Sequence, residues 1–258
     1  MELMIDSHAH YDDRRFDEDR EAVVASLIEK GVGAVIDAGC DFDTTAAAIA
    51  LAEKYGFFYA TAGFHPGNAD QVVDAEAAMS WLRTALSHPK VVALGEIGLD
   101  YHYDEPSREK QQEVFELQLC LAEELNVPVV IHDRDAHGDV MDAVRRHPKV
   151  RGVFHSFSGS PEMAKELIKL GWYISFSGVV TFKNAAKLPE VAAIVPADRF
   201  LIETDCPYLA PHPFRGQRND STLMAYTAER IAEIRDITPD EVRRLSAENT
   251  KRLFTKLK

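Results

Sequence analysis

The chain has few cysteines, and they are far apart in the sequence. Its 258 residues include only Cys40, Cys120 and Cys206. No two of them form a CxxC pair, so the sequence indicates neither a disulfide framework nor a cysteine-based zinc motif. We expect reduced, packed thiols in a cytoplasmic protein.

Long apolar runs and positive charge are also scarce. No run approaches the ~18 apolar residues of a membrane helix. The first residues lack the basic stretch and following apolar stretch of a signal peptide, so we expect none. Lys and Arg number 29 against 42 Asp and Glu, a net charge of −13. This balance gives no general attraction to nucleic acid or anionic lipid, although a bound cation would add local positive charge. Nothing in the sequence indicates an oligomeric state.

Short apolar, β-branched segments recur along the chain. They cover residues 3–7, 34–39, 57–64, 91–98, 127–132, 152–157, 172–178 and 199–205. Each is mostly apolar rather than alternating, which is typical of parallel strands covered on both faces. Helical spacing lies between and after them, at 14–30, 44–55 with Thr44 as its cap, 75–86, 108–125, 136–147, 161–170, 185–194, 222–235 and 238–256. This alternation predicts an α/β protein, a (β/α)8 TIM barrel forming a single domain over residues 1–258, with a doubly wound open sheet as the alternative.

Residues capable of chemistry gather at the ends of these predicted strands, where the active sites of such barrels lie. A single histidine there is more often structural than catalytic. Here, however, six of the ten histidines fall at or just beyond a strand end, and independent structural roles would not gather them in this way. The residues concerned are His8, His10, His65, His102, His132 and His155, together with Glu96, Glu203 and Asp205.

The first strand ends in His8-Ala9-His10. Residues two apart in an extended strand point to the same face, so both imidazoles can approach one point. Imidazole and carboxylate ligands suit Zn²⁺, Mn²⁺, Fe²⁺, Co²⁺ or Ni²⁺, and carboxylates also admit Mg²⁺. Four histidines with Glu96 and Asp205 suffice for two divalent cations, with Glu96 as the expected bridge. We expect Asp6 to orient His8 from behind.

The motifs that carry these residues resemble the TatD-type metal-dependent deoxyribonucleases, a branch of the amidohydrolase-like barrels. They are DSHAH (6–10), GFHPG (63–67), GEIGLDYH (95–102), IHDRDA (131–136), FHSFSG (154–159) and ETDCPYLAPHPFRGQRN (203–219), and the resemblance runs over essentially the whole chain. It implies that His8 and His10 hold one cation, that His132 and His155 hold the second, that Glu96 bridges them, and that Asp205 lies by the first. Several related amidohydrolases have a carboxylated lysine where this chain has Glu96, which favours the TatD branch.

Further residues are expected to act on the substrate. Two cations lower the pKa of water, and Asp205 is the expected proton acceptor. His65 and Glu203 are candidate helpers in substrate positioning or leaving-group protonation, although Glu203 could equally pair with an arginine. Arg134, Arg215 and Arg218 are candidate phosphate contacts, with a solvated loop as the alternative for 212–219. Residues 101–103, Tyr-His-Tyr, either stack on an unpaired base or form a packed loop.

The expected activity is divalent-metal-dependent hydrolysis of DNA phosphodiesters. The acidic net charge favours a single strand or strand end over long duplex DNA, and the resemblance favours 3′–5′ exonuclease action. An alternative is that the same site belongs to another hydrolase, such as a D-aminoacyl-tRNA deacylase. A metal-activated hydroxide can attack a carbonyl carbon as well as a phosphorus atom, so the site residues do not separate the two. A non-catalytic barrel is disfavoured because no expected ligand is missing. The cation in use (Mg²⁺, Mn²⁺ or Zn²⁺) and the choice of DNA over RNA stay open.

Overall fold

Eight parallel strands form one sheet in sequence order, from β1 to β8. The computed structural model describes residues 3–185 and 187–257. The strands are β1 (Met4–Ala9), β2 (Val32–Asp37), β3 (Phe58–Ala62), β4 (Val91–Asp100), β5 (Val129–Arg134), β6 (Gly152–Phe154), β7 (Tyr173–Phe176) and β8 (Phe200–Ile202). Each strand pairs in parallel with the next along the chain, so the chain winds once around an axis.

Backbone hydrogen bonds close the ring between β1 and the segment that follows β8. The His10 N–H donates to the Cys206 carbonyl at 2.7 Å, and the Asp205 N–H donates to the His8 carbonyl at 2.9 Å. Ala9 and Cys206 form a parallel bridge at the same place. The predicted single-domain α/β TIM barrel is therefore confirmed, and its seam lies at residues that were expected to bind metal.

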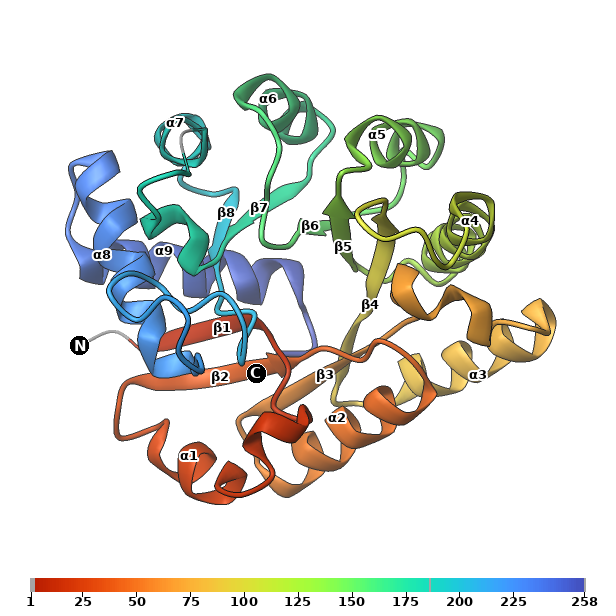
Figure 1. The fold of residues 1–258 in the computed structure, drawn as a ribbon, viewed down its shortest axis with the longest axis horizontal. Helices are drawn as coiled ribbons and strands as arrows, with labels where there is room; N and C mark the ends of the chain where they lie inside the picture. Colours follow the sequence, from red (N-terminus) through yellow and green to blue (C-terminus); the bar gives the residue numbers. More distant parts are fainter. Residues whose placement is uncertain (1–2, 186, 258) are drawn as a thin grey trace.

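Helices surround the strand ring (Figure 1). They are α1 (Arg20–Ser26), α2 (Phe42–Lys54), α3 (Ala75–Ser87), α4 (Arg108–Leu125), α5 (His137–Arg146), α6 (Pro161–Lys169), α7 (Leu188–Ile194), α8 (Met224–Arg235) and α9 (Pro239–Leu253). Short 3-10 turns lie at Arg14–Phe16, Pro66–Gln71, Gly178–Thr181 and Ser221–Leu223. Residues with good capping chemistry start several helices, such as Ser107 before α4 and Thr238 before Pro239 of α9.

The apolar core has two layers. One lies between the strands and the surrounding helices, where Phe58, Phe154 and Trp172 are almost completely buried. The other fills the inside of the barrel with side chains such as Ile36 and Val130, and it includes Phe254 and Leu257 from the end of the chain. The ammonium group of Lys256 donates to the carbonyls of Leu86, His88 and Val91, at the start of β4. The C-terminal segment thus closes the amino end of the barrel, and the carboxyl end is left for chemistry.

Several expected element boundaries were wrong. The helix expected over 14–30 is a 3-10 turn followed by the short α1, because the Arg20 guanidinium binds the carbonyls of Tyr11, Asp12 and Asp13 and turns the chain back. Thr44 does not cap α2 from outside: Asp41 is the N-cap, and Thr44 completes a capping box with it.

Other boundaries shift by a few residues. The strands expected to reach 157 and 205 end at Phe154 and Ile202, so the polar residues beyond them lie in turns. The helix expected over 185–194 begins at Leu188, and residue 186 lies outside the described residues. Within the described residues, no helix is both long and apolar enough to cross a membrane.

Candidate metal centre

Glu96 lies in the middle of the carboxyl end of the barrel and is 3% exposed. It comes from β4, all ten residues of which are buried. Two residues later Gly98 has a φ of +144°, and a Cβ there would lie 1.9 Å from the carbonyl oxygen of His132. Only glycine allows β4 to approach β5 so closely, and this approach brings Glu96 beside the histidine of β5.

One oxygen of Glu96 faces two histidines at the carboxyl end of β1, one inside the strand and one directly after it, which we call the β1 pair (His8 and His10). Their Nε2 atoms lie 3.1 Å apart. Glu96 Oε2 lies 3.3 Å from the first and 3.7 Å from the second. Asp205 Oδ1 approaches the same two nitrogens, at 3.3 Å from His10 and 3.7 Å from His8. Two imidazoles and two carboxylates thus converge on one point.

The other oxygen faces the β5–β6 pair (His132 and His155). His132 Nδ1 and His155 Nε2 lie 3.2 Å apart, and each lies 2.8 Å from Glu96 Oε1. We call the two pairs together with Glu96 the histidine centre. Its side chains come from β1, β4, β5 and the turn after β6, which the sheet order places around one rim.

The charges of the histidine centre stabilise one another. Burial opposes ionisation of Glu96, but the neighbouring His155, His8 and His65 outweigh it and hold the pKa of Glu96 well below its usual value. Burial likewise opposes charge on His10, yet its hydrogen bonds to Asp205 and Cys40 hold its pKa well above the usual value. The pKa of His8 is lowered, by burial and then by the charge of His155. The carboxylates stay ionised, so the centre favours bound positive charge.

Two further carboxylates support the β5–β6 pair from behind. Asp100 Oδ2 lies 3.1 Å from His132 Nε2, on the side opposite Glu96. Glu203 Oε1 accepts a hydrogen bond from the Ser156 N–H at 2.6 Å and lies 3.4 Å from His155 Nδ1. Sequence reasoning missed Asp100, although it lies four residues after Glu96 and therefore on the same face of an extended strand.

The imidazole of His65 faces the histidine centre with its Nε2 atom, because its Nδ1 atom is engaged in a hydrogen bond elsewhere. Its Nε2 lies 3.6 Å from Glu96 Oε1, while its Nδ1 accepts a hydrogen bond from the Gly67 N–H at 3.0 Å. Burial lowers the pKa of His65 to about 3, although the charge of Glu96 opposes this shift. A neutral imidazole whose Nδ1 accepts carries its proton on Nε2. His65 therefore presents an N–H donor to the centre.

Cys40 is a neighbour of the centre that the sequence did not indicate. Its thiol donates to Glu96 Oε2 at 3.6 Å. Burial and then the charge of Glu96 raise the pKa of the Cys40 thiol to about 12. The thiol is therefore protonated in this arrangement and acts as a hydrogen-bond donor to Glu96.

Asp6 does not orient the His8 ring as expected. Its carboxylate accepts hydrogen bonds from the Thr204 N–H and hydroxyl and from the Ser221 hydroxyl, at 3.0, 2.6 and 2.7 Å. To His8 it offers only a backbone contact, accepting from the N–H at 3.3 Å. Asp6 instead ties β1 to the segment after β8, and so fixes the seam from which Asp205 projects.

The expected phosphate contacts have different surroundings. Arg218 donates both guanidinium nitrogens to Asp19, each at 2.7 Å. Arg215 lies 4.6 Å over the Phe182 ring, and Arg134 lies 5.3 Å over the Tyr103 ring. A substrate phosphate would have to compete with Asp19 for Arg218, whose guanidinium also lies 4.8 Å over the Phe16 ring.

The residues after Glu96 divide between packing and exposure. The Tyr101 hydroxyl donates to Asp139 at 2.6 Å, so Tyr101 packs against α5. Tyr103 is 61% exposed and is available for stacking.

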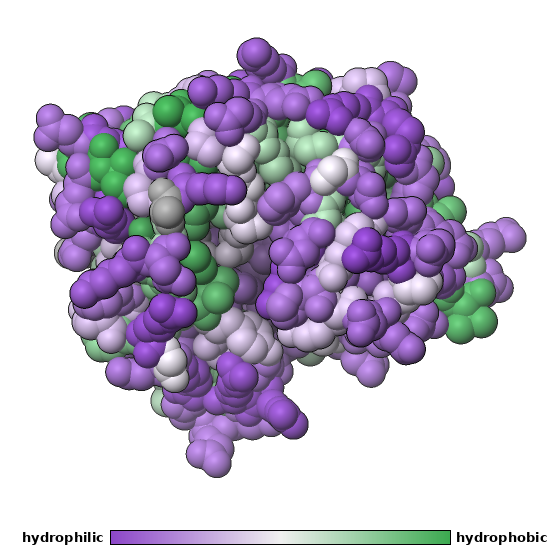
Figure 2. Space-filling view, turned by 45° about the horizontal axis from the view of Figure 1, so that its top comes forward, coloured by the Kyte–Doolittle hydropathy of each residue, from purple (hydrophilic) through white to green (hydrophobic). Residues whose placement is uncertain are grey.

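The face shown in Figure 2 is mainly hydrophilic, with apolar side chains in scattered groups.

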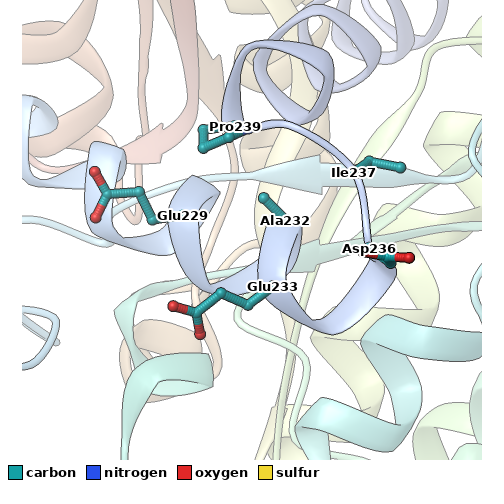
Figure 3. A pocket seen from close by; sticks show the side chains of 6 residues that line it. All are labelled: Glu229, Ala232, Glu233, Asp236, Ile237 and Pro239. Atoms are coloured by element: carbon teal, nitrogen blue, oxygen red, sulfur yellow. The ribbon is translucent and has the colours of Figure 1, made fainter.

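A hollow away from the histidine centre lies between the end of α8 and the start of α9 (Figure 3). Three of its lining side chains are the carboxylates of Glu229, Glu233 and Asp236, and Glu233 pairs with Arg230 at 2.9 Å. Because α8 runs back toward the amino end of the barrel, the hollow lies at the opposite end from the histidines. An acidic lining by itself does not define a binding site.

A TIM barrel whose carboxyl rim gathers histidines around a shared carboxylate defines a metal-dependent hydrolase of the amidohydrolase-like fold. A family model described as TatD related DNase matches residues 5–255. The chain is 43% identical over 254 residues to the uncharacterized metal-dependent hydrolase YabD of Bacillus subtilis, covering 98% of this chain and 99% of that protein. The chain belongs to the TatD-related DNase family.

Solved structures agree with this assignment. The crystal structure of YjjV, a TatD homologue from Escherichia coli K12, aligns with a TM-score of 0.91 at 35% identity and covers 98% of each chain. A TatD family hydrolase from Entamoeba histolytica aligns with a TM-score of 0.89 at 22% identity, covering 99% of each chain, and this likeness shows the fold alone. The expected family and fold are therefore confirmed.

Proposed function

We propose that this hydrolase cleaves DNA phosphodiester bonds with two divalent cations, Mg²⁺, Mn²⁺ or Zn²⁺. The β1 pair with Asp205 would hold one cation, the β5–β6 pair would hold the other, and Glu96 would bridge them. The observation that carries the proposal is the division of Glu96, one oxygen 3.3 Å from His8 and the other 2.8 Å from both His132 and His155. Bound cations would supply Lewis acidity and lower the pKa of water.

The donor set fits such cations. Within each pair, two imidazole nitrogens face each other at 3.1 or 3.2 Å. Two facing imidazole nitrogens at this distance have room for one proton between them, and two ligands of one cation at roughly 2.0–2.2 Å are separated by about the same distance. The imidazole nitrogens suit Zn²⁺, and the carboxylate oxygens suit Mn²⁺ and also admit Mg²⁺.

Residues of this chain would then handle the proton and the substrate. Burial opposes ionisation of Asp205, but its hydrogen bond to His10 lowers its pKa, so the carboxylate is ionised near neutral pH and can accept a proton from water. The Nε2–H of His65 is suited to donate to a phosphoryl or leaving-group oxygen. Glu203 is 1% exposed, which favours a role in holding His155 over direct contact with substrate.

A single strand or strand end suits the rim better than duplex DNA. The chain carries a net charge of −13 and would repel a long polyanion outside its mouth. Arg134 on Tyr103 and Arg215 on Phe182 pair a cation with an aromatic face, a combination that binds phosphate and stacks on an unpaired base. Arg218 stays a weaker candidate because Asp19 already occupies it.

An oligonucleotide panel tests this proposal. Single-stranded DNA labelled at its 3′ or 5′ end, duplex DNA, RNA and a D-aminoacyl-tRNA are each incubated with protein loaded with Mg²⁺, Mn²⁺ or Zn²⁺. We expect stepwise loss of nucleotides from the 3′ end of single strands, abolished in Asp205→Asn. Intact oligonucleotides beside hydrolysed D-aminoacyl-tRNA would overturn the proposal in favour of deacylation.

A further inference from the structure

Four potential ligand residues gather on the outside of the barrel, far from the histidine centre. Glu116, Cys120 and Glu123 are spaced four and three residues apart on α4, so they share one face of that helix. His147 follows α5 and reaches the same face. We call these four residues the outer cluster. It lies toward the amino end of the barrel, because α4 and α5 run antiparallel to the strands.

His147 is the buried member of the outer cluster, at 7% exposure. Glu123 Oε2 lies 3.1 Å from its Nδ1, and Glu116 Oε1 lies 2.8 Å from its Nε2. Glu116, Cys120 and His147 each place one ligand atom within 4.8 Å of the others. A thiol, an imidazole and a carboxylate therefore converge, and a second carboxylate lies on the far side of the ring.

The two carboxylates beside His147 fit a metal-bound imidazole better than they fit a neutral imidazole without metal. A neutral ring donates from one nitrogen only, so one of the two carboxylates must face a lone pair. If Glu123 accepts from Nδ1, the Nε2 lone pair points toward Glu116 and Cys120. Metal-bound histidines in proteins are oriented in this way, with a carboxylate on the nitrogen away from the metal.

Basic neighbours leave an alternative. The guanidinium of Arg146 lies 2.8 Å from Glu116 Oε2, the oxygen that does not face His147. The ammonium group of Lys149 lies 3.3 Å from Glu123 Oε1, which likewise does not face His147. With His147 protonated, the same residues would form a surface network of ion pairs that needs no metal. The thiol of Cys120 plays no part in that network, so it separates the two possibilities.

We propose that Glu116, Cys120 and His147 bind one thiophilic divalent cation of the Zn²⁺ class, with Glu123 orienting the histidine. Sulfur and nitrogen donors favour Zn²⁺, Co²⁺ or Cd²⁺ over Mg²⁺ and Ca²⁺. The cation would tie the middle of α4 to the connection between α5 and β6. It would stabilise the helical shell and take no part in hydrolysis, so this inference does not rest on the proposed function.

Cobalt is the probe that reports on the thiol directly. Cation-free protein is titrated with Co²⁺ in a Cys40→Ser background, because Cys40 lies beside the histidine centre. We expect thiolate-to-cobalt charge-transfer absorption that disappears on the further change Cys120→Ser and weakens on His147→Gln. The change His88→Gln, in a surface histidine paired with Glu53, is the matched control and should leave the absorption intact.

Protection of the thiol gives an independent measurement in the otherwise unaltered protein. Zn²⁺ should slow maleimide labelling of Cys120 by about tenfold or more, because a metal-bound thiolate is a poor nucleophile. Peptide mass spectrometry assigns the label to that cysteine. Equal labelling with and without Zn²⁺, together with cobalt spectra that do not change on Cys120→Ser, would overturn the proposal and leave an ion-pair network only. Cys120→Ser should leave hydrolysis unchanged.

Discussion

The two histidine pairs share Glu96 but are held in different ways. Behind the β5–β6 pair stand Asp100 and Glu203, 3.1 Å from His132 and 3.4 Å from His155. The Nδ1 atoms of His8 and His155 are both buried and have no hydrogen-bond partner among the described residues, but of these two atoms only that of His155 lies near a carboxylate, Glu203 at 3.4 Å. The β1 pair is positioned by the backbone bonds of the seam instead. Carboxylates behind metal-binding histidines fix the ring and raise its basicity, so we expect the β5–β6 side to keep its cation longer.

Removing the negative charge of Glu96 should weaken cation binding by both histidine pairs at once, so we expect the largest effect from this change. In Glu96→Gln, each pair loses the anion that balances a bound cation. We expect hydrolysis to fall by roughly three orders of magnitude, as the loss of several kcal/mol of transition-state stabilisation implies, and cation content to fall with it. Elemental analysis and initial rates measure this. Glu124→Gln, at a surface ion pair with Arg83, should change neither quantity.

Substituting a carboxylate next to only one histidine pair should weaken the binding of one cation and leave the other nearly unchanged. Asp100→Asn and Glu203→Gln leave Glu96 and all four histidines in place, and we expect each to weaken one cation by about 10–100-fold. Asp205→Asn should weaken the other cation instead. Calorimetric titration with Mn²⁺, fitted to two sites, distinguishes them. Equal weakening of both sites in all three variants would contradict the difference we infer between the pairs.

The pH dependence of cation binding should be set by the loss of protons from the charged histidines of the cation-free protein. Despite burial, neighbouring carboxylates hold the pKa values of His10 and His155 above the usual value. The stability that these charged imidazoles give the cation-free protein is complete below about pH 6.5 and is lost as pH rises through the raised pKa values. Cations then bind without displacing protons. The increase in Tm caused by Mn²⁺ should therefore grow as pH rises above about 6.5, and an increase that shrinks with pH would contradict this.

The smallest effects should come from the rim arginines. Arg215→Ala should raise KM for single-stranded DNA a few-fold with kcat unchanged, because it removes one phosphate contact. Arg218→Ala should lower Tm slightly and leave KM nearly unchanged, because its guanidinium is paired with Asp19. Steady-state kinetics and thermal melts of both variants check this, and the reverse pattern would make Arg218 the phosphate contact.

The sequence predicts the barrel and much of what its rim gathers, for a physical reason. Doubly covered parallel strands are mostly apolar, so histidines near their carboxyl ends, such as His8 and His132, are conspicuous. Cys40 and Asp100 were missed because their roles depend on which strands become neighbours. Asp205 has a φ of +57°, and that turn is fixed by contacts with β1 that are remote in sequence.

The seam between β1 and β8 has a consequence for the making of the protein. His8 and His10 lie near the start of the sequence and Asp205 lies far along it, and the backbone bonds that join β1 to the segment after β8 also bring these residues together. Because synthesis proceeds from the N-terminus, a growing polypeptide has its first imidazoles long before their aspartate partner exists. The two sides of the β1 pair's surroundings therefore cannot meet until the chain has been made as far as Asp205.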